Sequence, residues 1–285
     1  MQRNILLTCI ICLSTILATQ AQSRGRFANQ RFLDKQYWVG LRLGTNISKA
    51  KPENRYTIYS PTDGKNKSEY EKKYINLKSP AFEGGVDFTF DYKGLGVSLS
   101  PTYTRFRYGY ENNYAWQDTL DPSFKIDQKK TTSQSLDYFR VPLGIRFAPR
   151  QLKLRPSLTL GFYWSTLFAG NRSTQIQKTD FASGGSKTNT AENTLVGNKN
   201  LFIKTNLGWF TSMGVSYPFG NLRVSLEVAY WRNTHIITNR KARFNDQYIN
   251  HQEDIQDDVQ LRNLSASITF AMPLRFLSLN NSISE

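Results

Sequence analysis

The chain has 285 residues, of which 39% are hydrophobic, and it contains 18 Phe, 15 Tyr and a formal net charge of +15. This length fits one or two domains, and composition alone leaves the structural class open. The positive charge does not indicate a nucleic-acid-binding protein, because Lys and Arg are scattered through polar segments with no helix, finger or aromatic RNA motif to present them. We therefore expect no nucleic-acid partner.

The N-terminus has the parts of a secretory signal peptide. Arg3 supplies a positive start, residues 5–17 are apolar or small, and Thr19-Gln20-Ala21 offers small residues at the positions that a signal peptidase reads. The alternative is a membrane anchor, but a helix needs about 20 apolar residues to cross a bilayer, more than this run contains. We predict a signal peptide over residues 1–21.

The only two cysteines, Cys9 and Cys12, lie inside this segment. The mature chain should therefore have no thiol, disulfide or cysteine metal site, and we expect neither a metal nor another cofactor. No other segment is long and apolar enough for a transmembrane helix. A mature chain of this kind can enter a membrane only as a closed β-barrel, because only helices and edge-free sheets satisfy every backbone polar group in lipid.

Eight segments of the mature chain alternate with period two, with apolar side chains on one face and polar, small or charged side chains on the other. In the first segment, for example, Tyr37, Val39 and Leu41 lie opposite Gly40 and Arg42. A soluble β-sandwich alternates in the same way and is the rival fold. The eight segments are residues 37–47, 82–90, 95–103, 139–147, 157–165, 203–215, 222–230 and 263–272.

Two features favour the membrane barrel over the sandwich. Connections alternate in length, as in bacterial outer-membrane barrels, where the short turns are periplasmic. Aromatic residues gather at the strand ends, among them Tyr37 and Phe90 at one end and Phe82 and Tyr103 at the other, as expected at lipid headgroups. The short connections are residues 91–94, 148–155 and 218–221, and the long polar ones are 48–81, 109–135, 170–200 and 234–260.

We therefore predict an all-β protein of the outer membrane: an eight-stranded antiparallel up-and-down transmembrane β-barrel with short periplasmic turns and long extracellular loops. Its parts would be the signal peptide (1–21), a periplasmic N-terminal segment (22–36), the barrel (37–274) and a periplasmic tail (275–285). The positive charge of such a protein favours phosphate-bearing outer-leaflet glycolipid as the anion it meets. We expect outer-membrane lipid and lipopolysaccharide as partners.

The interior of an eight-stranded barrel is wide enough for side chains only, so we expect a packed polar plug and not a channel. Buried charges persist when they are paired, which predicts that Glu83, Asp87 and Glu227 are surrounded by basic side chains. An ion or substrate path is the alternative for the same residues. The predicted interior charge network comprises Arg42, Glu83, Asp87, Arg140, Arg146, Lys204, Arg223 and Glu227.

A family resemblance appears at the fourth and fifth segments. Residues 137–147 read DYFRVPLGIRF, and residues 155–161 read RPSLTLG. Together with KQYWVGLRLG at 35–44 and NLSASITF at 263–270, they resemble the PorT-like outer-membrane barrel proteins of the Bacteroidota over most of the mature chain. The resemblance implies the same barrel, and some family members serve a protein-export pathway across the outer membrane and gliding. The long basic loops of this chain depart from a minimal member.

These observations predict a non-enzymatic protein that acts as an envelope scaffold or as an accessory of an outer-membrane protein export or surface assembly. Outward loops on a rigid barrel carry most recognition, so Tyr110, Tyr114 and Trp116 are the candidate contact residues. The periplasmic residues 24–36 and the tail after Pro273 form a second candidate docking surface. Export-machinery proteins are the expected protein partners.

The alternative function is an outer-membrane barrel enzyme that modifies glycolipid acyl chains. Such an enzyme would use His235 or His251 with Glu227 or Ser225, but no nucleophile elbow or metal spacing accompanies them. The Ser183–Ser186 segment is not a phosphate loop, since no helix is expected to follow it. The Glu253-Asp254 and Asp257-Asp258 pairs lack the full EF-type ligand set and read as a solvated acidic patch.

Overall fold

The structure, a computed structural model, describes residues 35–57, 70–118, 120–121, 123–149, 152–181, 187–219, 221–244 and 254–274. The predicted signal peptide, most of the predicted N-terminal segment and the predicted tail at 275–285 lie outside these residues. Within the described ranges, no helix has the length and apolar character that a membrane span requires.

Eleven strands of the described chain form one sheet in which every pairing is antiparallel. The strands are β1 (Lys35–Asn54), β2 (Lys73–Ile75), β3 (Pro80–Tyr92), β4 (Leu95–Leu99), β5 (Thr102–Gln117), β6 (Lys125–Phe147), β7 (Arg155–Asp180), β8 (Lys187–Gly197), β9 (Thr205–Phe219), β10 (Leu222–Asn233) and β11 (Asp258–Pro273), with the 3-10 helix η3 (Lys199–Leu201) before β9.

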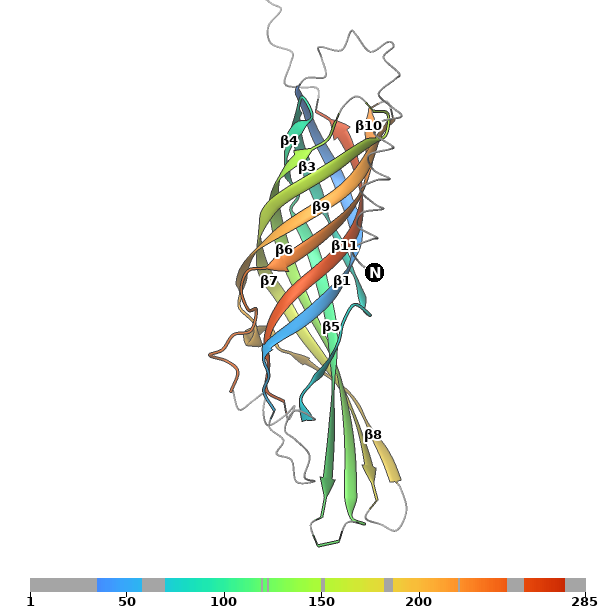
Figure 1. Ribbon diagram of the computed structural model, residues 1–285, viewed down its shortest axis with the longest axis vertical. Coiled ribbons are helices and arrows are strands. Elements are labelled where there is room, and N and C mark those ends of the chain that lie inside the picture. The colour runs from blue at the N-terminus through green and yellow to red at the C-terminus, as the bar shows by residue number, and fades with distance from the viewer. Residues whose placement is uncertain are drawn as a thin grey trace, which may run out of the picture.

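The pairings follow a closed circuit. β1 pairs with β3, β3 with β4 and β5, both of these with β6, and β6 with β7. The circuit continues from β7 to β9, β10 and β11, and β11 pairs with β1 through residues from Trp38 to Asn54. Figure 1 shows these strands tilted around a common axis. Because the last strand bonds to the first, the circuit is closed.

The third predicted segment, residues 95–103, is divided into β4 and the start of β5. The break falls at Ser100-Pro101, where proline has no N–H to donate to a ladder. The Ser100 N–H donates to the carbonyl of Pro142 (3.3 Å), and the Pro101 carbonyl accepts from the Val86 N–H (3.0 Å). The two neighbouring strands thus stay connected across the break.

Two of the predicted long loops are wrong, because residues 109–135 and 170–200 are largely strand. β5 runs to Gln117, β6 starts at Lys125 and β7 runs to Asp180, so these strands project far beyond the rest of the sheet (Figure 1). The extensions are rich in β-branched Thr, including the cross-strand pair Thr132 and Thr174. On the extensions of β6 and β7 both faces carry mostly polar side chains, so a search for apolar alternation does not find them. We call this end of the molecule the extended end, and the opposite end the turn end.

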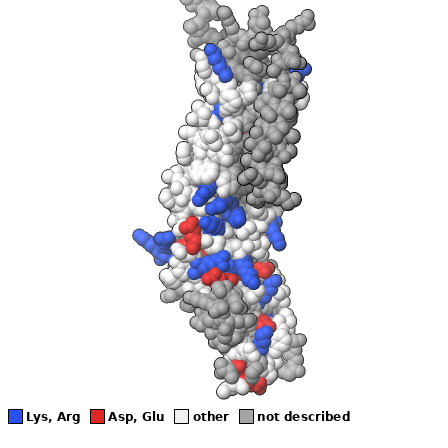
Figure 2. Space-filling view, viewed as in Figure 1, with Lys and Arg blue, Asp and Glu red and all other residues white. Residues whose placement is uncertain are grey.

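Near the turn end, the strands carry apolar side chains outward and polar side chains inward. Ile145 is 68% exposed and Phe162 is 76% exposed, whereas Glu83 and Arg140 are 0% and 1% exposed. This is the reverse of a soluble protein and the pattern of a lipid-facing barrel. Figure 2 agrees: on the face shown, Lys, Arg, Asp and Glu gather in the half toward the extended end, and the half above is largely uncharged.

Toward the extended end, the interior becomes apolar. Phe106, Leu136, Val259 and Leu261 point inward and pack in one buried cluster with Ile237. The Ile237 N–H donates to the Val259 carbonyl (2.9 Å) and its carbonyl accepts from the Ile203 N–H (2.8 Å). The segments that follow η3 and β10 therefore fold across the interior at this end and close it with an apolar layer.

Candidate functional site

The most buried charges form an ion pair in the interior between β6 and β3. An Arg140 Nη atom lies 2.9 Å from an Oε atom of Glu83, and both side chains are buried. The Arg140 guanidinium also lies 3.6 Å from the ring centroid of Trp231, with Phe106 and Tyr163 each at 5.9 Å. A cation held over aromatic faces and paired with a carboxylate is strongly favoured in a site without water.

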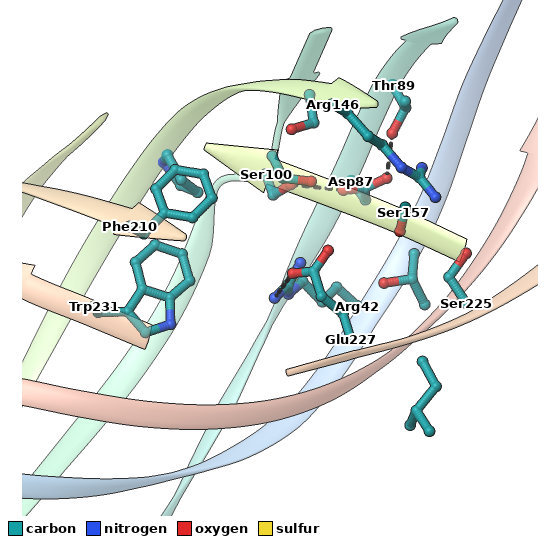
Figure 3. Close-up of a pocket in the computed structure, with 15 residues that line it drawn as sticks. Arg42, Asp87, Thr89, Ser100, Arg146, Ser157, Phe210, Ser225, Glu227 and Trp231 are labelled. Atoms are coloured by element: carbon teal, nitrogen blue, oxygen red, sulfur yellow. Dashed lines mark hydrogen bonds and ion pairs between the residues drawn. The ribbon is translucent and has the colours of Figure 1, made fainter. Parts of the chain in front are cut away.

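A second pair crosses the interior from β1 to β10. An Arg42 Nη atom donates to Glu227 Oε1 at 2.7 Å. Asp87 takes hydrogen bonds from the hydroxyls of Thr89 (2.8 Å) and Ser100 (2.6 Å). Figure 3 shows Arg42 and Glu227 next to each other, with Asp87 bonded to the two hydroxyls. Strand alternation places all of these polar atoms inward, where they satisfy one another.

A third pair lies nearer the turn end. An Arg223 Nη atom lies 2.7 Å from Asp91 Oδ2, and its guanidinium lies 4.4 Å from the ring centroid of Trp38. Asp91 was not among the predicted interior charges, because it falls at the predicted turn and the register that brings it inward is not visible in the sequence. Arg146 is also buried, and it lines the cavity shown in Figure 3.

The structure places seven of the eight predicted network residues on the inward face, and Lys204 is the exception. Lys204 is exposed and lies just before β9 begins at Thr205. The prediction that it belongs to the interior is therefore wrong. The alternation was extended into residues 203–204, where the chain has not yet entered the sheet and a long basic side chain reaches solvent.

The cavity between these side chains is small. Its volume is about 30 Å³, and its lining includes Arg42, Asp87, Arg146 and Glu227. A space of this size holds one or two water molecules. Since the apolar layer closes the extended end, the described interior offers a packed polar core and no wide path.

Beyond the apolar layer, a second group of buried charges lies at the extended end. We call Lys72, Arg172, Asp254, Asp257 and Tyr110 the mouth cluster. Lys72 Nζ lies 2.8 Å from Asp254 Oδ1 and 3.2 Å from Asp257 Oδ1, and an Arg172 Nη atom lies 3.3 Å from Asp254 Oδ2. The Tyr110 hydroxyl donates to Asp254. These contacts tie the segment before β11 to β5, β7 and the residues before β2.

The surroundings of the mouth cluster change its pKa values. Burial by itself raises the pKa of Asp254, but Lys72, Arg172 and Lys130 outweigh it, and the pKa falls to about 2. Burial and the neighbouring Asp257 raise the pKa of Tyr74, whose hydroxyl donates to that carboxylate at 2.8 Å. Asp254 therefore stays ionised and Tyr74 stays protonated at neutral pH.

The mouth cluster cannot be recognised from the sequence. Its partners lie between 82 and 185 residues apart, so no local spacing reveals them. Asp254, Asp257 and Asp258 were read as a solvated acidic patch, which is wrong, since they are 7%, 0% and 1% exposed. Glu253, the remaining member of the two acidic pairs, lies outside the described residues.

The candidate contact aromatics separate into different environments. Tyr110 is only 2% exposed and belongs to the mouth cluster, so its prediction as an outward contact is wrong. Tyr114 is half-buried, with its ring centroid 5.6 Å from that of Tyr70. Trp116 is exposed near the end of β5. Of the three, Trp116 is the side chain most available to a partner.

The structure describes three of the four residues of the enzyme alternative, His235, Glu227 and Ser225. His235 is exposed after the end of β10, Glu227 is held by Arg42, and Ser225 lines the interior cavity. His251 and the Ser183–Ser186 segment lie outside the described residues. In the described part of the chain, no three His, Cys, Asp or Glu side chains are grouped to hold a metal ion.

A closed antiparallel circuit with an apolar outer face and paired charges inside defines a transmembrane β-barrel protein. The family model described as outer membrane protein beta-barrel domain matches residues 20–232. The chain belongs to this family and is a protein of the outer membrane. Comparison with curated proteins found no match.

Several solved outer-membrane proteins are similar to the chain at low identity. Ail, the attachment invasion locus protein of Yersinia pestis, has 12% identity and a TM-score of 0.33 over 83% of this chain and 99% of Ail. OprG of Pseudomonas aeruginosa has 13% identity and a TM-score of 0.43 over 84% of this chain and 95% of OprG. The outer membrane protease OmpT of Escherichia coli has 9% identity and a TM-score of 0.30 over 85% and 98%.

Proposed function

We propose that the protein is a closed, non-enzymatic scaffold barrel that serves as an accessory of an outer-membrane protein export or surface assembly. The observation that carries the proposal is the packed interior, in which Arg42 and Arg140 are paired with Glu227 and Glu83 and the cavity next to Arg42 and Glu227 has a volume of about 30 Å³. A barrel with such an interior does not work as a wide pore. The function of such a barrel then depends on its surface and not on its interior.

The proposed barrel has eight transmembrane strands. β4 and β5 share the neighbours β3 and β6, so they count as one interrupted transmembrane strand. β2 and β8 each pair with a single strand and stand outside the circuit. The turn end would face the periplasm and the extended end the exterior, because short turns are periplasmic in outer-membrane barrels.

The extended end supplies the docking surface of this proposal. The hairpin of β5 and β6 pairs continuously from Thr102–Arg140 to Gln117–Lys125, and β7 follows β6 as far as Asp180. A platform built from strands of the barrel itself has a fixed orientation, so it costs little conformational entropy to bind. Trp116, exposed near the end of this platform, is the proposed contact.

The proposed export role draws on the PorT-like resemblance of residues 137–147 and 155–161. A Bacteroidota origin and a signal peptide at residues 1–21 are parts of the same proposal. The proposed partners are export-machinery proteins together with outer-membrane lipid and lipopolysaccharide. The basic, hydrogen-bonded extended end suits contact with such surfaces.

Gene deletion and a platform variant test the role together. Deletion should block secretion of a defined cargo class, and the full-length gene should restore it. A variant in which a tight turn replaces residues 112–130 removes the β5–β6 hairpin of the platform but no residue of the eight transmembrane strands near the turn end, so it should insert and yet fail to restore secretion. Trp116→Ser leaves the strands in place and removes only the proposed contact, so it should also lower secretion. Normal secretion in the deletion strain would overturn the accessory role.

Planar-bilayer recording tests the closed interior. The purified protein should show no stable large conductance, because charged side chains and the apolar layer fill the interior. A variant carrying Arg42→Ala and Glu227→Ala, which opens the cavity, is the positive control for small current steps. A stable nanosiemens-scale conductance of the unmodified protein would overturn the proposal.

The enzyme alternative predicts a change in lipid acyl composition on gene deletion and the same change in a His235→Ala strain. The exposure of His235 counts against it, since Glu227 is paired with Arg42 and Ser225 lines the interior cavity. Lipid analysis of the same deletion strain decides between the two functions.

A further inference from the structure

A side groove opens in the barrel wall where β3 begins at Pro80. The β1–β3 ladder stops at Ile47–Pro80, and β3 pairs with β5 only from Glu83–Thr104 to Gly85–Thr102. β2 joins β5 again at Gly109. Within the described residues, β5 therefore has no ladder partner on this side between residues 105 and 108.

The groove is sizeable and has a polar floor. Its volume is about 430 Å³, and it is lined by Gly44, Thr45, Pro80, Ala81, Phe82, Tyr103, Arg105 and Arg107. The buried Asn46 closes the floor, since its Nδ2 donates to the carbonyl of Arg105 at 3.1 Å across the gap. The groove is thus separated from the barrel interior, and it opens on the outer surface of the barrel wall.

Cations border the groove on the side of the extended end. Arg105 is held by both oxygens of Asp137, at 2.6 and 2.8 Å, so that pair adds little net charge. Arg107 is exposed and, within the part of the chain that the structure describes, has no carboxylate partner. It is the free guanidinium of the groove.

Two exposed lysines lie close in the chain to residues that line the groove, although they are not part of its lining. The Leu77 N–H donates to the Ser48 carbonyl at 3.1 Å, which brings the segment before β3 next to β1. Lys49 and Lys78 are the chain neighbours of these two residues, and both are exposed. Guanidinium and ammonium groups at one rim form a site for a phosphate group.

Apolar side chains border the groove on the side of the turn end. Phe82 is 55% exposed and Tyr103 is 38% exposed. Leu43, which precedes the lining residue Gly44 on β1, is 47% exposed. These side chains belong to the outward face that meets lipid. A ligand in the groove would therefore touch cations at one end and the hydrocarbon layer at the other.

We propose that this groove binds a phosphate-bearing glycolipid of the outer leaflet. Its phosphate would lie on Arg107, between Lys49 and Lys78, and an acyl chain would lie along Phe82 and Tyr103. The proposal rests on the orientation given under Proposed function for its place in the cell, but the binding itself needs only the folded barrel. Charge at one rim and apolar surface at the other favour this ligand over a peptide or a free anion.

Native mass spectrometry of the detergent-solubilised full-length mature barrel tests the site. The probes are phosphorylated lipid A, the same lipid A after enzymatic dephosphorylation, and inorganic phosphate. Phosphorylated lipid A should bind at one high-affinity site, and dephosphorylated lipid A should bind about five- to tenfold more weakly, the range for one charged hydrogen-bonded contact at a partly exposed site. Millimolar inorganic phosphate should not displace the lipid.

Two variants and a control locate the site. Arg107→Gln should weaken phosphorylated lipid A about five- to tenfold and leave dephosphorylated lipid A unchanged. Phe82→Ser should weaken both acylated probes. Lys199→Gln removes an exposed charge at η3, across the circuit from the groove, and should change neither. All variants should keep the heat-modifiable gel migration of a folded barrel.

Three results would overturn the proposal: equal binding of the two lipid A forms, equal effects of Arg107→Gln and Lys199→Gln, or displacement of the lipid by inorganic phosphate. None of these results bears on conductance or cargo secretion, so a failed glycolipid site is distinguishable from a failed accessory role.

Discussion

At the scale of single residues, the stability of the interior depends on buried charged side chains, each of which is paired with an oppositely charged side chain and not with water. Arg140 and Glu83 are almost fully buried, and Arg140 is also packed against Trp231. Removing one member of such a pair leaves the other buried and uncompensated, which costs more than the pair itself contributes.

Glu83→Gln should therefore lower the free energy of unfolding by about 3–5 kcal/mol, since it leaves the Arg140 guanidinium without its carboxylate. The double variant Glu83→Gln with Arg140→Met should be less destabilised than Glu83→Gln alone. Urea titration of the protein in lipid vesicles measures both. A double variant at least as unstable as the single one would show that desolvation of Arg140 is not the main cost.

The mouth cluster predicts an acid-sensitive extended end. The folded-state pKa of Asp254 is about 2, below the value of about 3.9 in an unfolded chain. Its contribution to stability is therefore complete above about pH 4 and is lost as the pH falls toward 2.

Hydrogen exchange of the segment before β11 should accordingly accelerate between about pH 4 and pH 2, relative to the exchange expected from the pH alone. In Asp254→Asn, the segment should exchange faster at neutral pH, and the additional acceleration in acid should be smaller. Equal acid profiles for the two proteins would exclude Asp254 as the group responsible.

At the scale of elements, the sequence predicted the strands that face lipid and missed the strands that do not. The alternation of apolar and polar residues at 82–90 or 139–147 has a physical cause, because one face meets hydrocarbon and the other meets charges. The extensions of β6 and β7 carry polar side chains on both faces, even where the inward face is buried, so Thr-rich residues such as 131–135 read as a loop. The mouth cluster was missed for a different reason, since its contacts exist only after distant segments meet.

Neighbouring residues of β7 test the assignment of the two faces. Leu160 is 57% exposed on the outward face, and Thr159 is buried next to Arg146, its pairing partner on β6. Leu160→Asp should destabilise the barrel by about 1–3 kcal/mol, because it places a carboxylate in the hydrocarbon layer. Thr159→Asp should cost less, since it gains a basic neighbour. Vesicle-based unfolding measures the difference, and equal costs would mean that the faces are misassigned.

At the scale of the whole molecule, the two ends differ. Residues 93–94 join β3 to β4 by a tight turn with positive φ at Lys93 (49°) and Gly94 (92°), whereas β5 to β8 extend the other end. The proposed orientation gives this asymmetry a direction across the membrane, with the docking platform on the outside.

Single-cysteine labelling tests this orientation, since the sequence has no cysteine after Cys12. On intact cells, a membrane-impermeant maleimide should label Trp116→Cys and should not label Lys93→Cys. After the outer membrane is permeabilised, both should react. Labelling of Lys93→Cys alone on intact cells would reverse the orientation.

The continuity of β6 and β7 has a mechanical consequence. The two strands are bonded to each other from Phe147–Leu158 near the turn end to Ile126–Asp180 at the tip, with one register shift at Asp137/Tyr138. A pull on the tip along the strands loads these bonds together in shear, not one after another as in unzipping. Tension applied to the extended end would therefore reach the barrel wall through continuous backbone, without a hinge between the extension and the wall.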